Sequence, residues 1–395
     1  MGNEAYIVSS VRTAVGKAKR GTLRNKRPEE MGAAAVKGAI EKISDLTPEM
    51  IDDVLIGCAM PEGQQGLNMG RAIGQMAGLP DAVPAATINR FCSSGLQTIA
   101  MAVQSISAGH TDIVVAGGAE SMSMVPMSGF YFSPNPALMD NDPDMYVSMG
   151  ITAENVAERF KISREDQDAF SYRSHKNAVD AIQAGKFSDE IVPLPVNDTI
   201  YRDGKTEQLE TVFNTDEGPR ADTNVEALSK LRPVFKAKGT VTAGNSSQMS
   251  DGAAASVVMS EEKVKELNAQ PIARLVTFAV AGVAPEIMGV GPIESIPKAL
   301  KRAGMSIGDI GLVELNEAFA AQALAVIRTV GIDEDIVNVN GGAIAMGHPL
   351  GCTGAKLTST LLHEMMRRNV KYGMCTMCIG GGMGATGIFE NLMLN

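Results

Sequence analysis

Apolar and polar positions follow the same succession in two separate stretches of the chain. In the first stretch, the apolar run IDDVLIGC (51–58) predicts a buried strand, and the segment INRFCSS (88–94) leads into a helix. That helix extends from about Gly95 to Ala108 and ends at Gly109, and the apolar strand DIVVAG (112–117) follows it. One face of the helix is apolar, formed by Leu96, Ile99, Ala100, Val103 and Ile106.

The second stretch repeats this order near the C-terminus. The run 310–318 predicts a strand, the glycine-dense segment 337–354 a loop, and the residues after it a helix that reaches about Arg368. The apolar run 374–382 then predicts a strand that enters glycines. Alternating strands and helices of this kind predict an α/β protein with two similar halves, each a helix-covered sheet. A site at the junction would draw residues from both halves.

A segment of different composition separates the two stretches. It is rich in Met, Pro and Asp at first, continues with a polar helix near 152–185, and ends in a charged stretch. Long connections with helices of their own are usually functional. We therefore expect an N-terminal half at 1–118 that is completed by about 241–268, an inserted loop domain at 119–240 that covers the substrate site, and a C-terminal half at 269–395.

Composition narrows the class of protein. The 395 residues are 45% hydrophobic and 20% charged, which is typical of a globular protein and excludes a disordered one. No apolar run is long enough to span a membrane, and the first residues lack the build of a signal peptide, so we expect a cytoplasmic protein. Five cysteines are too few and too irregular for a disulfide framework, which indicates a reducing compartment.

The charge pattern bears on the ligand. The net charge of −10 argues against a nucleic-acid partner. Basic residues nevertheless gather in one short stretch: Lys17, Lys19, Arg20, Arg24, Lys26 and Arg27. This stretch is either a solvated surface loop, which is the usual role of such a run, or a rim that faces phosphate groups.

Candidate nucleophiles and bases are few. Of the four histidines, His110, His175 and His363 have no companion residues and fit surface or packing roles. His348 lies in GGAIAMGHPLGCTG, where glycines let the backbone approach a ligand and the following proline restricts the orientation of the residue. Cys92 lies at a predicted strand-to-helix turn, where the helix N-terminus favours a thiolate. The alternative for Cys92 is a buried, inert thiol.

Two further motifs point to other chemistry and fail on context. Cys375 and Cys378 form a CxxC, but no second pair of Cys or His completes a zinc site, and on a strand the two side chains face opposite sides. Cys378, beside three glycines, is the better site candidate. Residues 382–387 match G-x-G-x-x-G, yet only eight residues follow, too few for the rest of a dinucleotide-binding unit.

Over essentially its whole length the chain resembles the thiolase family. The matching stretches, in the family's order, are NRFCSSGLQ, AGGAESMS, MGITAENVAERF, TAGNSSQMSDGAAA, NEAFAAQA, VNVNGGAIAMGHPLGCTGA and CIGGGMG. The resemblance implies the thiolase fold, in which two similar α/β halves form a five-layered αβαβα arrangement with an inserted loop domain. It also implies a homodimer or homotetramer.

The resemblance also implies roles, position by position. Cys92 resembles the nucleophile that takes the acyl group, His348 the base that activates it, and Cys378 the second acid/base, which moves a proton at the α-carbon. Asn316 resembles the residue that holds a water in one oxyanion hole with His348, and the amides of Cys92 and Gly380 resemble the other hole. A covalent acyl carrier, a proton carrier and fixed donors are what such a two-step reaction needs.

For the ligand, the resemblance implies coenzyme A as co-substrate, with no permanently bound cofactor and no metal. Arg220 and the segment through Phe235 resemble the loop that holds the adenine end, and Ser247 a contact to the pantetheine arm. Phe319 and Met149 resemble parts of the pocket near the thioester.

Within the family the chain is more similar to the degradative 3-ketoacyl-CoA thiolases than to the acetoacetyl-CoA-specific acetyltransferases, which remain the alternative. Cys92 precedes Ser-Ser-Gly-Leu-Gln, where the acetoacetyl-specific branch has Gly-Ser-Gly-Leu, and Ser148 stands where that branch tends to carry His. A ketoacyl synthase would carry a second His in place of Cys378. A non-catalytic acyl-CoA-binding relative would have lost Cys92, His348 or Cys378.

Overall fold

The computed structural model describes residues 3–202 and 204–394. Two mixed sheets meet edge to edge at one residue pair, Ile7 with Ala273. The first sheet has the order β4 (Ala85–Ile88), β3 (Asp53–Gly57), β5 (Ile113–Ser121), β9 (Ser250–Ser260) and β1 (Ala5–Thr13). The second has the order β11 (Leu312–Leu315), β12 (Tyr372–Ile379), β13 (Met383–Asn391) and β10 (Ala273–Gly282). The short strands β2 (Gly16–Lys17) and β6 (Ile191–Val192) pair with β9 and β1.

The two sheets repeat each other, as the sequence pattern predicts. β3 is parallel to β5, and β5 is antiparallel to β9, which is antiparallel to β1. In the same positions of the second sheet, β11 is parallel to β12. β12 is antiparallel to β13, and β13 is antiparallel to β10. The counterpart of β4 is reduced to a single parallel bridge between Val313 and Val337.

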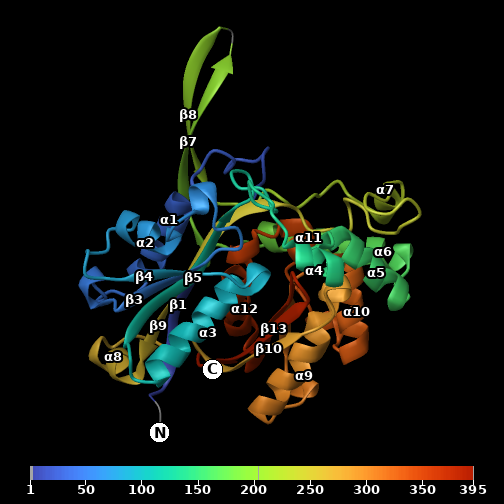
Figure 1. The fold of residues 1–395 in the computed structure, drawn as a ribbon. Coiled ribbons are helices and arrows are strands. Elements are labelled where there is room, and N and C mark those ends of the chain that lie inside the picture. The colour runs from blue at the N-terminus through green and yellow to red at the C-terminus, as the bar shows by residue number, and fades with distance from the viewer. Residues whose placement is uncertain (1–2, 203, 395) are drawn as a thin grey trace.

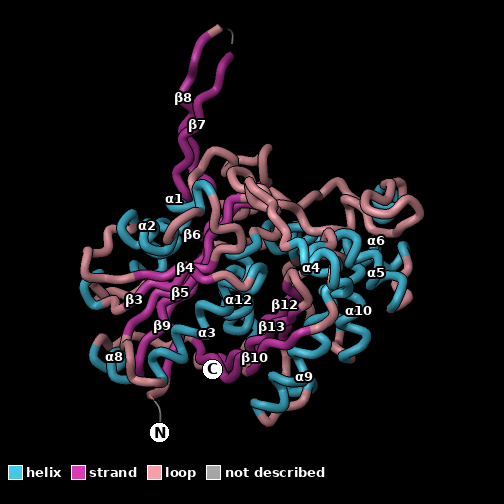
Figure 2. The backbone as a smooth tube through the Cα atoms, viewed as in Figure 1, coloured by secondary structure: helices cyan, strands magenta, loops and turns pink. Residues whose placement is uncertain are grey.

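Helices complete five layers (Figure 1). α1 (Pro28–Glu41) and α2 (Met69–Met76) cover the outer face of the first sheet, and α3 (Ser94–Ser107) and α12 (Leu350–Arg368) lie between the sheets. α9 (Gly291–Ala303) and α10 (Ala320–Val330) lie on the far side of the second sheet. Figure 2 shows the strands running through the centre with helices on both sides. This arrangement is the predicted thiolase fold.

The alternation of side chains along the strands explains the layers. In β3, Val54 and Ile56 pack into the outer core under α1, whereas Leu55 faces the central helices. At the centre, α3 and α12 approach closely because glycines face each other. A Cβ on Gly95 would lie 2.6 Å from the amide nitrogen of Ala355, and one on Gly354 would lie 2.3 Å from that of Leu96.

The segment between β5 and β9 differs from its prediction in two respects. The single polar helix expected near 152–185 is two helices, α5 (Met149–Arg159) and α6 (Arg164–Gln183). The break occurs where Lys161 takes a positive φ of 55° and the Ser163 side chain caps α6 by accepting from the Asp166 amide. The second difference is a hairpin of β7 (Leu194–Arg202) and β8 (Lys205–Phe213), which projects from the body (Figures 1 and 2).

The remaining helices are short: α4 (Pro136–Asn141), α7 (Val225–Ser229), α8 (Glu261–Glu266) and α11 (Ala343–Met346). The G-x-G-x-x-G match at 382–387 falls almost entirely on β13, not on a strand-to-helix turn. The glycines serve packing instead, since a Cβ on Gly384 would lie 2.1 Å from the backbone of Gly291 at the start of α9. None of the described helices combines the length and apolarity that a membrane crossing requires.

Candidate active site

Cys92 lies in a single 3-10 turn, Phe91–Ser93, between β4 and α3. Phe91 takes a positive φ of 42°, and the turn is held by the Ser94 hydroxyl, which accepts from the Arg90 amide and donates to the Phe91 carbonyl. The backbone amides of Gly380 and of Cys92 itself act on the thiol and lower its pKa. The loop after β12 therefore reaches Cys92 in the other half.

Burial, rather than the helix end, controls the charge of this thiol. Cys92 is 2% exposed, and burial raises the pKa of its thiol to about 12, against the lowering effect of the two amides. The local effect that favours a thiolate at this turn is present, but burial outweighs it. The thiol keeps its proton at neutral pH and needs a base.

His348 is held in one tautomer. We assign the hydroxyl proton of Thr353 to the Pro349 carbonyl (3.0 Å), which makes Thr353 Oγ1 the acceptor from His348 Nδ1, 2.6 Å away. The proton is thereby assigned to Nδ1, and Nε2 is free to accept; Asn316 Nδ2 lies 3.4 Å from it. Burial, with Lys356 adding to it, lowers the pKa of His348 to about 3, so the imidazole is neutral at pH 7.

Cys378 and Asn316 come from adjacent strands of the second sheet. Cys378 lies near the end of β12, and burial, followed by the nearby Cys92, raises the pKa of its thiol. Cys375 points to the opposite face, into the core between the sheets, as period two predicts. Asn316 follows β11, and its buried Oδ1 has no hydrogen-bond partner among the described residues.

One cavity of about 470 Å³ joins these groups. Phe235 and Phe319 form part of its wall with an edge-to-face contact, ring centroids 6.2 Å apart. The lining includes eight of the residues singled out in the sequence: Cys92, His348, Cys378, Ser148, Met149, Phe235, Ser247 and Phe319. Asn316 and Gly380 do not line this cavity themselves. Asn316 contacts the lining residue His348, and the Gly380 amide acts on the lining residue Cys92.

Arg220 does not line this cavity. Its side chain is 61% exposed and pairs with Asp222, and its amide donates to His175 Nδ1. The backbone just before Arg220 does reach the cavity. The side chain of Gln248, which lines the cavity, donates to the Gly218 carbonyl.

A second cavity of about 480 Å³ adjoins the first. The two share Met127, Ser148, Met149 and Met288 in their walls. The second continues past Phe91 and Gly380 toward Met145 and Tyr146. An apolar space therefore continues beyond the three reactive side chains.

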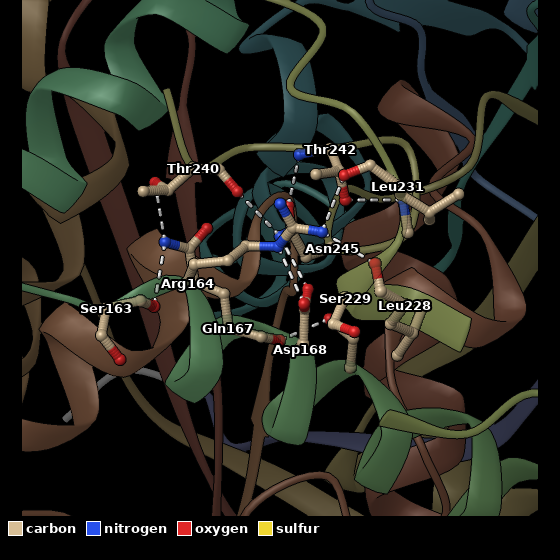
Figure 3. A network of polar contacts seen from close by, with 12 residues as sticks. Ser163, Arg164, Gln167, Asp168, Leu228, Ser229, Leu231, Thr240, Thr242 and Asn245 are labelled. Carbon is tan, nitrogen blue, oxygen red and sulfur yellow. Dashed lines mark hydrogen bonds and ion pairs between the residues drawn. The ribbon is translucent and has the colours of Figure 1, made fainter. Parts of the chain in front are cut away.

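A polar network fixes the segment that carries Phe235 (Figure 3). Arg164 pairs with Asp168 (2.8 Å) and donates to the carbonyls of Leu228 and Leu231. Asn245 donates to Asp168 and to the Thr240 carbonyl, which holds the other end of the segment. Helix α6 thus anchors both ends of the 228–245 strap over the cavity.

Asp168→Ala is expected to destabilise this strap. Asp168 is 1% exposed, and its loss removes the buried carboxylate that pairs with Arg164 and accepts from Asn245, which costs about 3 kcal/mol of unfolding free energy. Urea unfolding measures the loss, and weaker ligand binding in the cavity that Phe235 lines is expected with it. Asp180→Ala, which removes an exposed i,i+4 pair from the same helix, is the control and should change neither quantity appreciably. Equal effects of the two substitutions would contradict the anchoring role.

Three residues near the site were not anticipated from the sequence. Thr353 holds the His348 ring, Lys356 donates to the Gly347 carbonyl (3.3 Å), and Glu120 accepts from the amides of Ala59, Met60 and Gly351. The only sequence signal for Thr353 and Lys356 was their spacing on the predicted helix that follows His348. A buried lysine cannot be told from an exposed one in a single sequence.

Comparison with known proteins agrees with this geometry. The thiolase N-terminal domain model matches residues 5–262 and the thiolase C-terminal domain model residues 269–391. A 3-ketoacyl-CoA thiolase of Bacillus subtilis is 58% identical over 388 residues, covering 98% of this chain and 99% of that protein. An acetyl-CoA acetyltransferase of Rhizobium meliloti is 44% identical over 404 residues, covering 99% of this chain and 100% of that protein.

Solved structures give the same result. The crystal structure of the Bacillus anthracis acetyl-CoA acetyltransferase superposes with a TM-score of 0.89 at 41% identity, and that of human mitochondrial 3-ketoacyl-CoA thiolase with 0.88 at 39%. Each comparison covers 99% of both chains. The chain belongs to the thiolase family.

Proposed function

We propose that the protein is a 3-ketoacyl-CoA thiolase, which cleaves a 3-ketoacyl-CoA with coenzyme A into acetyl-CoA and a shortened acyl-CoA. The observation that carries this proposal is the single cavity that brings together Cys92, His348 and Cys378 from both halves. Full-length relatives named 3-ketoacyl-CoA thiolase support it. The alternative, an acetoacetyl-CoA-specific acetyltransferase, also has full-length relatives and differs in substrate range.

In the first step His348 Nε2 takes the proton of the Cys92 thiol, and the thiolate attacks the 3-keto carbon. The bond between carbons 2 and 3 then breaks, leaving an acyl group on Cys92 and the enolate of acetyl-CoA. The Cys378 thiol donates its proton to carbon 2 of the enolate, and acetyl-CoA leaves. A neutral imidazole and two protonated thiols, the states that burial favours here, are what this step requires.

In the second step the Cys378 thiolate takes the proton of the coenzyme A thiol. The coenzyme A thiolate attacks the acyl group, and Cys92 leaves as a thiolate that regains its proton from His348. Negative charge on the thioester oxygen can be stabilised by the amides of Cys92 and Gly380, which already lower the pKa of the thiol. Asn316, with its unpartnered Oδ1 and its contact to His348 Nε2, is suited to hold a water as the second oxyanion site.

Coenzyme A enters this proposal as a co-substrate whose pantetheine arm passes Ser247 and whose phosphates meet the basic stretch at 17–27. Two observations favour this stretch as a phosphate-facing rim. The amides of Lys17 and Thr22 donate to Glu217, which places the stretch beside the segment that leads to Arg220. Lys17 and Arg220 also act together to lower the pKa of His175, after burial.

The second cavity supports a range of acyl chains, and we propose that the inserted segment 119–240 covers this end of the site. A 3-ketoacyl-CoA of six to ten carbons is expected to be used at least as well as acetoacetyl-CoA, because each buried CH₂ contributes about 0.8 kcal/mol. Methionine walls can repack around chains of different length. A series of kcat/KM values over chain length measures this.

Ser148 stands in the wall that the two cavities share. Ser148→His is expected to narrow the passage and shift preference toward acetoacetyl-CoA, whereas Ser148→Ala should keep the parent's profile. The Ser148 side chain makes no capping hydrogen bond to α5, so neither change removes one. A parent enzyme that turns over only acetoacetyl-CoA would establish the acetyltransferase alternative instead.

We also propose a homodimer or homotetramer in the cytoplasm. The edge strand β4 pairs only with β3 within the described sheet, which leaves its other edge free for a second copy. The five cysteines are all free and buried, which suits a reducing compartment.

A further inference from the structure

The first turns of α12 hold three consecutive residues of the loop that carries His348. Thr353 accepts from the His348 ring and donates to the Pro349 carbonyl, and Lys356 Nζ donates to the Gly347 carbonyl. Thr353 and Lys356 are three positions apart and therefore share one face of the helix. One helix face thus fixes the ring of His348 and the backbone on both sides of it.

Lys356 occupies an environment that is costly for a cation. Its side chain is fully buried, and one carbonyl is its hydrogen-bond acceptor among the described residues. Glu314 on β11 contributes a carboxyl whose two oxygens are buried without a hydrogen-bond partner in the described chain. Burial raises the pKa of Glu314 and lowers that of Lys356. A methionine would fill the same space more cheaply, so stability alone does not account for the lysine.

The other charged groups around Lys356 are largely paired. Arg12 on β1 repels it, but Arg12 is itself held by Asp216 (2.8 Å) and Glu190 (2.6 Å). Asp216, Glu314 and the Cys352 thiol on α12 act in the opposite direction. Lys356 is therefore the charged group that acts on His348. Burial is the largest cause of the lowered pKa of His348, and Lys356 is the next.

We propose that Thr353 and Lys356 are positioning residues that set the state of His348 for proton transfer. Thr353 selects the tautomer with Nε2 free to take the Cys92 proton. Lys356 anchors the Gly347 carbonyl and places a positive charge near the imidazole, so that the protonated ring returns its proton readily to the leaving Cys92 thiolate. This inference rests on the proposed role of His348 as the base.

Two pairs of substitutions test it, each with a conservative partner. Thr353→Val removes the hydroxyl at nearly constant volume, and Thr353→Ser retains it. A misoriented base slows the chemical step. Thr353→Val should therefore lower kcat about 10- to 100-fold with little change in KM, and Thr353→Ser should recover most of the loss. Lys356→Met removes the charge and the donor, and Lys356→Arg retains both.

The pH dependence of Cys92 alkylation by iodoacetamide separates charge from packing. His348 must be neutral to act as base, so alkylation falls as pH drops through its pKa. Lys356→Met removes a group that lowers this pKa, so the fall in alkylation at acid pH (the acid limb of the profile) should move to higher pH. Lys356→Arg should leave the acid limb in place. If Lys356→Met does not fold, Lys356→Gln retains a donor without the charge and should show the same shift. An unshifted limb in a folded, uncharged variant would overturn the role of Lys356.

Two controls distinguish the possible failures. Thr360→Val removes a buried hydrogen bond to Glu190 (2.9 Å) one turn further along α12, and should lower stability without changing kcat or the acid limb. If His348→Asn leaves alkylation and kcat at parental values, the proposed base is wrong. If His348→Asn is inactive while Thr353→Val and Lys356→Met match the parent, the base stands and the positioning inference is wrong.

Discussion

Cys92→Ala protein is expected to lose at least about 10⁴-fold in kcat for thiolysis, because no acyl-enzyme can form without the nucleophile. Direct transfer to the coenzyme A thiol would need that thiol at the position of the Cys92 sulfur, where the amides of Cys92 and Gly380 point. The loss of absorbance of the acetoacetyl-CoA enolate, in the presence of coenzyme A, measures the rate.

Peptide mass mapping makes this prediction specific to one thiol. After a brief quench of the parent enzyme with a 3-ketoacyl-CoA, the acyl group should be found on the peptide containing Cys92. Recovery of the acyl group on Cys378, or on no cysteine, would show that the nucleophile has been misassigned. The five cysteines are free thiols, so each is open to this comparison in the denatured, quenched protein.

Cys378→Ala is expected to separate the two kinds of chemistry. The variant should still form the Cys92 acyl-enzyme from acetyl-CoA but should lose about 10²- to 10⁴-fold in making or breaking the carbon–carbon bond, the usual scale for a general acid or base. The physical reason is that the Cys378 thiol, kept protonated by burial, is the proton donor to the enolate in the shared cavity.

Cys375→Ala is the matched control for Cys378→Ala. Cys375 is equally buried on the same strand but faces the core between the sheets, so its truncation should cost some stability and leave thiolysis near the parental rate. Near-normal thiolysis by Cys378→Ala, or equal losses in the two variants, would refute the assigned proton transfer.

The sequence alone determined the features that depend on local pattern. Apolar periodicity predicted the strand–loop–helix–strand repeat in both halves, and the structure confirms it in β3, α3 and β5 and in β11, α12 and β12. Period two correctly placed Cys375 and Cys378 on opposite faces of one strand.

The break between α5 and α6 and the β7–β8 hairpin were missed for a related reason. The break depends on a positive φ at Lys161, a residue with no strong preference for that conformation. Strand β8 carries mostly polar side chains that are exposed on all but its last residue, so it lacks the apolar signal of a buried strand.

Only the tertiary structure decided the protonation states and the supporting residues of the site. The Cys92 thiol was expected to ionise at a helix end, but burial between two halves of the fold outweighs that local effect. Thr353 and Lys356 gain their roles from the direction in which α12 leaves the His348 loop, and the buried Lys356–Glu314 environment joins α12 to β11. Desolvation and long-range contacts of this kind depend on which segments the fold packs together, and a single sequence does not specify them residue by residue.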